Sequence, residues 1–151
     1  DNYFLAGVLH DIGKLIFFEY ISDEYANVLT YSEESAVEIR EAELKILGIN
    51  HQTIGGLVAD QWKLPSNIKN VIRYHHNPNI VTSADKLMVS VIHLADILVK
   101  SLCLGYSGDN FVPRPDKEIV ANLKLPDDIF HKIYNILVAE FQQTSAMLLS
   151  N

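Results

Sequence analysis

The sequence has few of the features that would tie it to an oxidising compartment, a nucleic acid or a membrane. Its single cysteine, Cys103, excludes an intramolecular disulfide and fits a reducing compartment, so we expect a cytoplasmic protein. Basic residues number 12 against 19 acidic ones, and none of them form a stretch that could follow a DNA or RNA backbone. The longest apolar tract, 87–99, is interrupted by His93 and Asp96, so no membrane span is expected.

The residues that are present indicate a single all-α domain. The chain has 151 residues, 48% of them hydrophobic and 21% charged, which is enough to bury a sizeable core. Apolar residues recur at helical spacing, and no alternation predicts a strand, so we expect a compact bundle of roughly six to eight helices. The predicted helices cover 3–19, 22–30, 32–47, 51–62, 67–76, 84–104 and 125–149.

Several local signals set the boundaries of these helices. Gly48 is a natural helix stop, Asn50 can cap the helix that follows, and the Gly55-Gly56 pair permits close approach of another backbone. The glycines and prolines of 105–116 indicate a loop. We expect one domain over 1–151 in which 117–151 forms a C-terminal helical tail.

The most informative stretch is "AGVLHDIGKL", where His10 and Asp11 lie in an apolar run and are followed by Gly13 and Lys14. Burying two ionisable groups among hydrophobic residues is costly unless something compensates for it. Similar polar residues recur in apolar settings further along the chain. They are His51 at a helix start, His75 and His76 at a helix end, and Asp96 in the middle of the long helix.

Imidazoles and carboxylates without a thiolate cluster form a ligand set that suits Fe, Mn, Ni or Zn. An aspartate beside a histidine can bridge two metals, and two adjacent metals can generate hydroxide and hold a phosphate. The alternative is a fully hydrogen-bonded polar core without metal. Single residues have plainer interpretations: His93 is typical of packing beside a site, Trp62 of a core anchor and Arg73 of a surface ion pair.

The order His-Asp, His, His-His, Asp resembles the HD superfamily of metal-dependent phosphohydrolases, and within it the HDOD domain of bacterial signalling proteins. The resemblance spans about residues 3–104. It is carried by "AGVLHDIGKL", by Glu43 ahead of "LGINHQTIGGLVADQWKLP", by "VIRYHHNP" and by "VIHLADIL".

The resemblance implies an HD-type helical fold and one or two bound divalent metal ions. It places metal ligands at His10, Asp11, His51, His75, His76 and Asp96. It also implies that Asp11 bridges the metals, that Lys14 contacts the phosphate, and that a metal-activated hydroxide cleaves a phosphate ester or phosphodiester. The substrate would be a phosphorylated small molecule or a nucleotide.

This sequence departs from the active HD pattern in two ways. Active HD enzymes carry a further His or Glu ligand on a helix before the HD pair, and none of the nine residues before His10 is either. We therefore expect an N-terminal helical portion to be missing. The Gly-Tyr-Pro signature of the cyclic-dinucleotide branch does not follow His76. A second hypothesis is thus a catalytically inactive regulatory domain that acts through contacts with a signalling protein.

Overall fold

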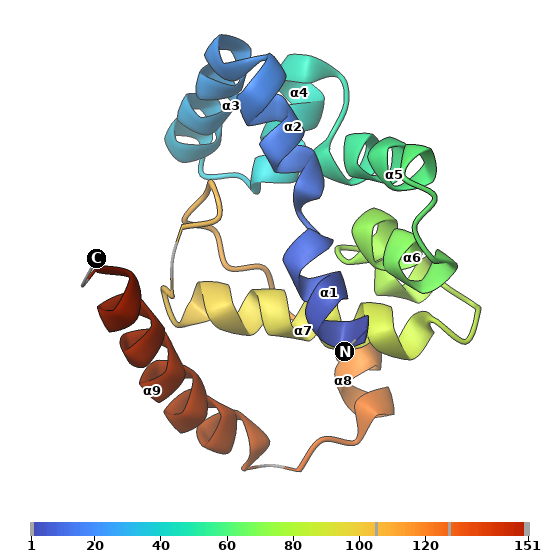
Figure 1. Cartoon of the computed structure of the whole chain (residues 1–151), viewed down its shortest axis with the longest axis vertical. Helices are drawn as coiled ribbons and strands as arrows, with labels where there is room; N and C mark the ends of the chain where they lie inside the picture. The colour runs from blue at the N-terminus through green and yellow to red at the C-terminus, as the bar shows by residue number, and fades with distance from the viewer. Residues whose placement is uncertain (1, 105, 127, 150–151) are drawn as a thin grey trace. The chain divides into compact units, whose positions relative to one another are not determined.

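The computed structural model describes residues 2–104, 106–126 and 128–149, and every regular element in these ranges is helical, which confirms the predicted all-α class (Figure 1). The helices are α1 (Asn2–Leu9), α2 (Ile12–Tyr20), α3 (Ser22–Ser35), α4 (Ile39–Leu47), α5 (His51–Gln61), α6 (Ser66–Tyr74), the 3₁₀ turn η1 (Pro78–Ile80), α7 (Lys86–Ser101), α8 (Lys117–Leu123) and α9 (Ile129–Leu149). Within the described ranges, no helix has the length and apolar character needed to cross a bilayer.

The contacts within the chain divide it into two compact units, 1–115 and 116–151. The second unit contains α8, whose first turn is capped by the Asp116 carboxylate, and α9. Asp127, which lies in the sequence expected to open the last helix, is outside the described residues, as is Gly105 of the predicted loop. All the residues expected to form a site belong to the first unit.

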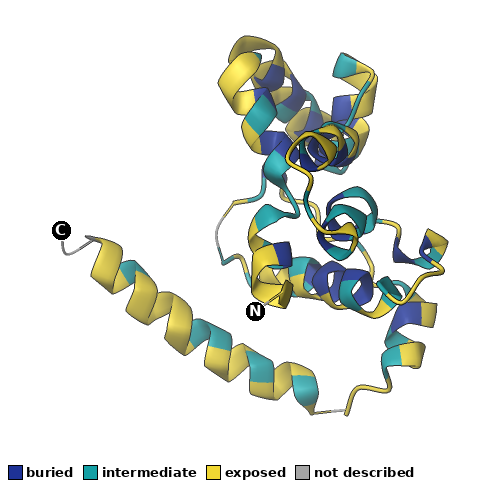
Figure 2. Cartoon of the chain, turned by 45° about the vertical axis from the view of Figure 1, so that its right-hand side comes forward, coloured by how far each residue is buried: buried dark blue, intermediate teal, exposed yellow. Residues whose placement is uncertain are grey.

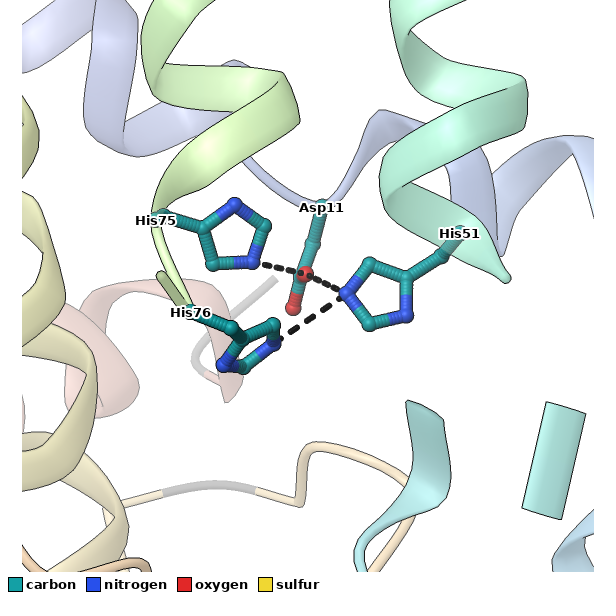
Figure 3. A group of neighbouring side chains, drawn as sticks. All are labelled: Asp11, His51, His75 and His76. Carbon is teal, nitrogen blue, oxygen red and sulfur yellow. Dashed lines mark hydrogen bonds and ion pairs between the residues drawn. The ribbon is translucent and has the colours of Figure 1, made fainter. Parts of the chain in front are cut away.

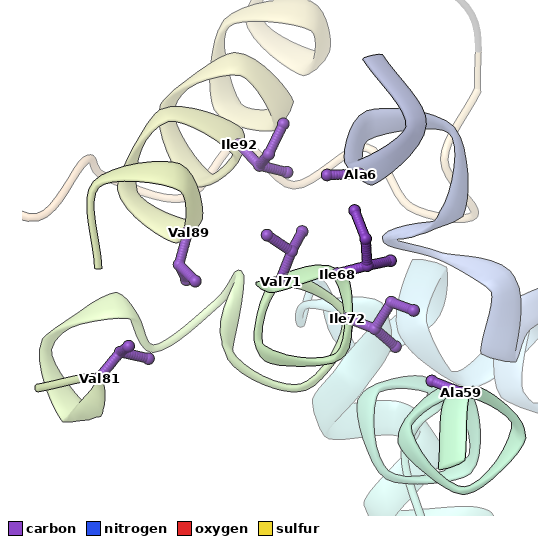
Figure 4. Packing of buried hydrophobic residues seen from close by; sticks show 8 residues of the cluster. All are labelled: Ala6, Ala59, Ile68, Val71, Ile72, Val81, Val89 and Ile92. Carbon is purple, nitrogen blue, oxygen red and sulfur yellow. The ribbon is translucent and has the colours of Figure 1, made fainter. Parts of the chain in front are cut away.

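Two hydrophobic clusters stabilise the first unit. One joins α1, α5, α6 and α7 through residues such as Ala6, Ile72 and Val89 (Figure 4). The other joins α2, α3 and α4 around Phe17 and Tyr25. Buried positions face inward from these helices (Figure 2). The connection from α1 to α2 therefore passes from one core to the other, and the His-Asp pair lies in that connection.

The helix predicted over 3–19 is in fact two helices, because α1 ends at Leu9 and α2 begins at Ile12. His10 and Asp11 form the turn between them. No proline or other breaker marks this point in the sequence. The reason for the break is tertiary: α2 packs its first turn directly against α5, and this packing overrides the local helical preference.

Gly13 and Gly55 make that packing possible. A Cβ on Gly13 would lie 2.0 Å from the carbonyl oxygen of His51, and one on Gly55 would lie 3.2 Å from the amide nitrogen of Gly13. The two backbones therefore touch, which confirms the close approach predicted at Gly55-Gly56. The contact places the residue before α2, Asp11, beside the first residue of α5, His51.

Two other expectations about helix boundaries have different outcomes. A new helix was expected to begin near Ser32, but α3 continues to Ser35 and α4 begins only at Ile39. Ser32 and Ser35 therefore lie inside α3 and do not start a new helix. The helix ends at Ala36, which adopts the left-handed conformation. Gly48 ends α4 with a φ of 73°, as predicted.

The cap of α5 gives a test of modest size. Asn50 Oδ1 accepts hydrogen bonds from the Thr53 amide at 3.0 Å and from the Thr53 hydroxyl at 2.8 Å. Replacing Asn50 by alanine should therefore lower the free energy of unfolding by about 1 kcal/mol, measured by urea denaturation. Asn50→Ser restores an acceptor and should recover most of the loss. Equal stabilities for the alanine and serine variants would contradict the capping role.

Candidate metal centre

Four parts of the first unit bring ionisable side chains to one point. The turn between α1 and α2 supplies His10 and Asp11, and the first residue of α5 is His51. His75 and His76 follow α6 directly, and Asp96 comes from the middle of α7. Figure 3 shows Asp11 between His51 and His75, with His76 turned toward His51.

The two oxygens of the Asp11 carboxylate face different partners. Oδ1 lies 3.4 Å from His51 Nε2 and 3.5 Å from His75 Nε2. Oδ2 lies 3.4 Å from His10 Nε2 and accepts a hydrogen bond from Lys14 Nζ at 2.7 Å. Asp11 therefore joins a buried group of histidines to a second group on the side of His10.

The remaining members extend these two groups. His76 Nε2 lies 3.2 Å from His51 Nε2, so Asp11, His51, His75 and His76 form a set whose ligand atoms all lie within 4.8 Å of one another. On the other side, His10 Nε2 lies 3.8 Å from Asp96 Oδ1. All six predicted metal ligands thus belong to one continuous cluster.

Hydrogen bonds from Nδ1 to backbone carbonyl oxygens orient two of the histidines. His10 Nδ1 lies 2.6 Å from the Gly7 carbonyl oxygen, and His75 Nδ1 lies 3.1 Å from the carbonyl oxygens of Val71 and Ile72. Because carbonyl oxygens only accept, each Nδ1 carries the proton that it donates. In the neutral ring the lone pair is then on Nε2, which is the atom that faces the cluster.

His51 is oriented by a carboxylate. Its Nδ1 lies 2.7 Å from Glu43 Oε2, which also accepts the His51 amide at 2.8 Å. The other oxygen of Glu43 accepts the Tyr25 hydroxyl at 2.9 Å. All three residues are fully buried. A carboxylate behind a histidine is the usual way in which proteins fix the tautomer of a metal-binding imidazole and raise its basicity.

Burial and contacts within the cluster shift the pKa values of its histidines and carboxylates. Burial lowers the pKa of His75 to about 4, and burial together with the neighbouring histidines lowers the pKa of His76. Burial opposes ionisation of Asp11 and Asp96, but contacts with His10 outweigh it and lower both pKa values. At neutral pH the site therefore offers the neutral imidazoles of His75 and His76 beside the ionised carboxylates of Asp11 and Asp96.

His10 differs from the other histidines. Burial opposes its charge, yet its contacts with Asp11 and Asp96 are strong enough to raise its pKa to about 10. In the chain by itself, His10 thus carries the proton that balances part of the carboxylate charge.

The cluster passes a simple test of fit to a divalent metal. The buried atoms His10 Nε2, Asp11 Oδ1 and His75 Nε2 make no hydrogen bond with any described residue, which would be costly for a purely structural polar core. The distances between neighbouring donor atoms, 3.2 to 3.5 Å, also match those of ligands that share an ion. Ligands at ~2.1 Å from an ion lie roughly 3.0 to 3.5 Å apart in octahedral or tetrahedral geometry.

The other residues singled out in the sequence have varied positions. Lys14 is buried and also donates to the Ser107 carbonyl oxygen at 3.0 Å. His93 Nδ1 lies 2.7 Å from the His75 carbonyl oxygen, so it packs beside the site. Arg73 pairs with Asp60 on the surface, as expected. Trp62 is 55% exposed, so its interpretation as a core anchor was wrong: it follows the last turn of α5 and points outward.

Sequence reasoning missed two residues beside the cluster, Lys100 and Asp109. Lys100 Nζ lies 3.9 Å from Asp96 Oδ2 and 3.9 Å from Asp109 Oδ2. The spacing of four residues between Asp96 and Lys100 on a helix was a usable signal for the first pair. Asp109 lies in an irregular segment, where no pattern in the sequence indicates its position. Glu43 was noted only as part of the resemblance, without a role.

Comparison with known proteins places the chain beside one family. Residues 1–78 match the family model of the HDOD domain. An uncharacterised protein of Treponema pallidum (strain Nichols) is 24% identical over 102 residues, which are 68% of this chain and 20% of the relative. A crystal structure of an HDOD domain protein with unknown function from Geobacter sulfurreducens has a TM-score of 0.76 at 23% identity. The match covers 94% of this chain and 52% of that structure.

Proposed function

Because this chain belongs to the HDOD domain family, we propose that its histidine–aspartate cluster binds divalent metal and catalyses the hydrolysis of a phosphate ester. The domain would carry out this reaction as part of a signalling protein. The observation that carries the proposal is the set of Nε2 atoms that face Asp11, with their Nδ1 atoms held by oxygens behind them. The ligands would be His10, Asp11, His51, His75, His76 and Asp96. The ions, roughly one or two per chain, would be Fe, Mn, Ni or Zn.

The arrangement of Asp11 favours a bridging role for this residue. Its Oδ1 faces His51 and His75, whereas its Oδ2 faces His10. Lys14 holds the carboxylate in this orientation through its 2.7 Å hydrogen bond to Oδ2 and is itself held by Ser107. We assign Lys14 to positioning Asp11 and to balancing its charge.

A bound divalent metal lowers the pKa of water and polarises the oxygens of a phosphoryl group. In the proposed hydrolysis, a bond from the water oxygen to phosphorus would form while the bond from phosphorus to the leaving oxygen breaks, and the leaving oxygen would take up a proton derived from the water. The chain's part is to fix the donor atoms in advance. Rigid orientation of His51 by Glu43 and of His75 by backbone carbonyls does this before any substrate arrives.

A second candidate is a regulatory module without turnover. The observation in its favour is a group of exposed apolar side chains on α1 and α2, including Phe4, 78% exposed, and Leu15, 62% exposed. Exposed apolar side chains that adjoin one another mark contact surfaces with other proteins. In this alternative the metal would stabilise the fold, and the output would be a change in that contact.

Metal content tests the proposal directly. Protein loaded with Mn²⁺ and passed through a desalting column should retain roughly one or two ions per chain by elemental analysis. Asp11→Ala should retain almost none, because both groups of histidines lose their shared carboxylate. His131→Ala, which changes an exposed histidine of α9, is the matched control and should bind metal like the wild type.

Turnover of p-nitrophenyl phosphate and bis-p-nitrophenyl phosphate by the loaded protein then separates the two candidates. Metal-dependent release of p-nitrophenol that is lost in Asp11→Ala supports the hydrolase. A wild-type protein that retains no metal would overturn the metal proposal. Metal retention without hydrolysis of either ester would favour the regulatory module.

A further inference from the structure

A cavity of about 460 Å³ adjoins the cluster within the first unit. Its lining contains His10, Asp11 and Asp96 together with residues from the end of α7 and from the segment that follows it. This volume lies in the range of small-molecule sites, which is ~300–1,000 Å³. A second cavity of about 320 Å³ shares Asp11 but is lined by Lys14 and apolar residues of α2. The two lysines of the site therefore line different cavities.

Lys100 lies in the last turn of α7, and its side chain is only 7% exposed. Its ammonium lies 3.9 Å from a carboxylate oxygen of Asp96 and 3.9 Å from one of Asp109. These distances hold the charge in place but exceed hydrogen-bonding range. The side chain lines the first cavity.

Lys14 differs from Lys100 because its ammonium donates hydrogen bonds within the protein. Two of its three N–H groups are used by Asp11 Oδ2 at 2.7 Å and by the Ser107 carbonyl oxygen at 3.0 Å. To bind a ligand strongly, Lys14 would have to give up contacts that keep Asp11 in place. Lys100 lines the larger cavity, and its nearest printed partners are carboxylate oxygens at 3.9 Å, beyond hydrogen-bonding range.

The two carboxylates beside Lys100, those of Asp109 and Asp96, have other partners as well. Asp109 Oδ2 accepts the amide of Ile39 at 2.8 Å, at the start of α4, and its Oδ1 accepts the amide of Phe111 at 3.0 Å. A carboxylate at a helix N-terminus has much of its charge compensated by the amides there. Asp96 faces His10, and under the proposed function its charge would be taken up by metal.

We propose that Lys100 is the anion-binding residue of the 460 Å³ cavity and receives a phosphate group of a phosphorylated small molecule beside the metal ligands. This inference rests on the proposed function, because the phosphorylated molecule is the substrate class of the proposed metal site. The phosphate would lie in the cavity that Lys100, His10 and Asp96 line together. Lys14 serves instead to position Asp11.

The test is binding of inorganic phosphate to the Mn²⁺-loaded protein, measured by isothermal titration calorimetry. Lys100→Met keeps most of the apolar stem but removes the charge, and it should weaken binding by about 10- to 100-fold. Its manganese content should stay at the wild-type level. Lys45→Met, an exposed change on α4, is the control and should bind phosphate as the wild type does.

The outcomes separate the two proposals. Wild-type phosphate affinity in Lys100→Met overturns the assignment of Lys100, as does a loss of phosphate binding in Lys14→Met protein that still retains its manganese. If the wild type retains no manganese, the metal proposal fails and the titration is run on the metal-free protein. A loss of phosphate binding in Lys100→Met then still supports the anion site, whereas no binding by the wild type overturns it.

Discussion

Replacing Gly13 by alanine should destabilise the protein by about 3 kcal/mol or more and remove its ability to bind metal. The added Cβ would lie 2.0 Å from the carbonyl oxygen of His51, 2.7 Å from its carbonyl carbon and 2.9 Å from the amide nitrogen of Gly55. These are backbone atoms, so no side-chain rotation can relieve the overlap. The first turn of α2 would have to move away from α5, and Asp11 would move away from His51.

Gly7→Ala is the matched control for this change. Gly7 also lies in a helix of the first unit, but a Cβ there would meet only a side-chain carbon of Ile92 at 3.8 Å. Alanine should therefore be neutral or stabilising by up to ~1 kcal/mol, because it favours the helix. Urea denaturation and manganese content of the two variants check both statements. A Gly13→Ala protein as stable and as rich in metal as Gly7→Ala would show that the α2–α5 contact is not what positions Asp11.

The contact at Gly13 also shows where sequence reasoning succeeds and where it stops. The cap at Asn50, the stop at Gly48 and the helical periodicity were readable because each depends on residues a few positions apart. The break at His10-Asp11 was not readable, because it is imposed by α5, about forty residues further along the chain. The sequence within 3–19 is fully compatible with one continuous helix.

The residues of the site also divide into those that the sequence could predict and those that it could not. Its six predicted ligands could be recognised because their types and their order form a motif, and the structure brings all of them into one cluster. Asp109 carries no such signature, since its place beside Lys100 depends on the path of the segment after α7. Trp62 shows the converse error: its residue type predicted burial, but its place at the end of α5 leaves it 55% exposed.

Glu43 should be the most sensitive position among the residues that support the ligands. Its carboxylate accepts three hydrogen bonds from fully buried donors, namely the hydroxyl of Tyr25 and two N–H groups of His51. Glu43→Leu leaves all three donors without an acceptor, so it should cost about 3 kcal/mol or more of unfolding free energy. Glu41→Leu, an exposed change on the same helix, is the control and should alter stability by less than ~0.5 kcal/mol.

Glu43→Gln separates the effect on the fold from the effect on the ligand. A glutamine oxygen can still accept both N–H groups of His51 while its NH₂ group donates to the Tyr25 hydroxyl, so the hydrogen bonds survive and only the charge is lost. Stability should fall far less than in Glu43→Leu. Affinity for Mn²⁺ should nevertheless fall by about 10- to 100-fold, because loss of a carboxylate behind a metal-binding imidazole typically costs this much in metal affinity.

Titration of Mn²⁺ into the folded glutamine variant, alongside the wild type and Glu41→Gln, checks this expectation. Wild-type affinity in Glu43→Gln would mean that Glu43 only fills and satisfies the core between α3 and α4. A fall in affinity with stability preserved would mean that the carboxylate acts through the imidazole on the bound ion. The second result would connect the buried hydrogen bonds among Tyr25, Glu43 and His51 to the metal centre. If these hydrogen bonds only stabilised the fold, removing the charge of Glu43 while keeping them would leave the affinity for Mn²⁺ unchanged.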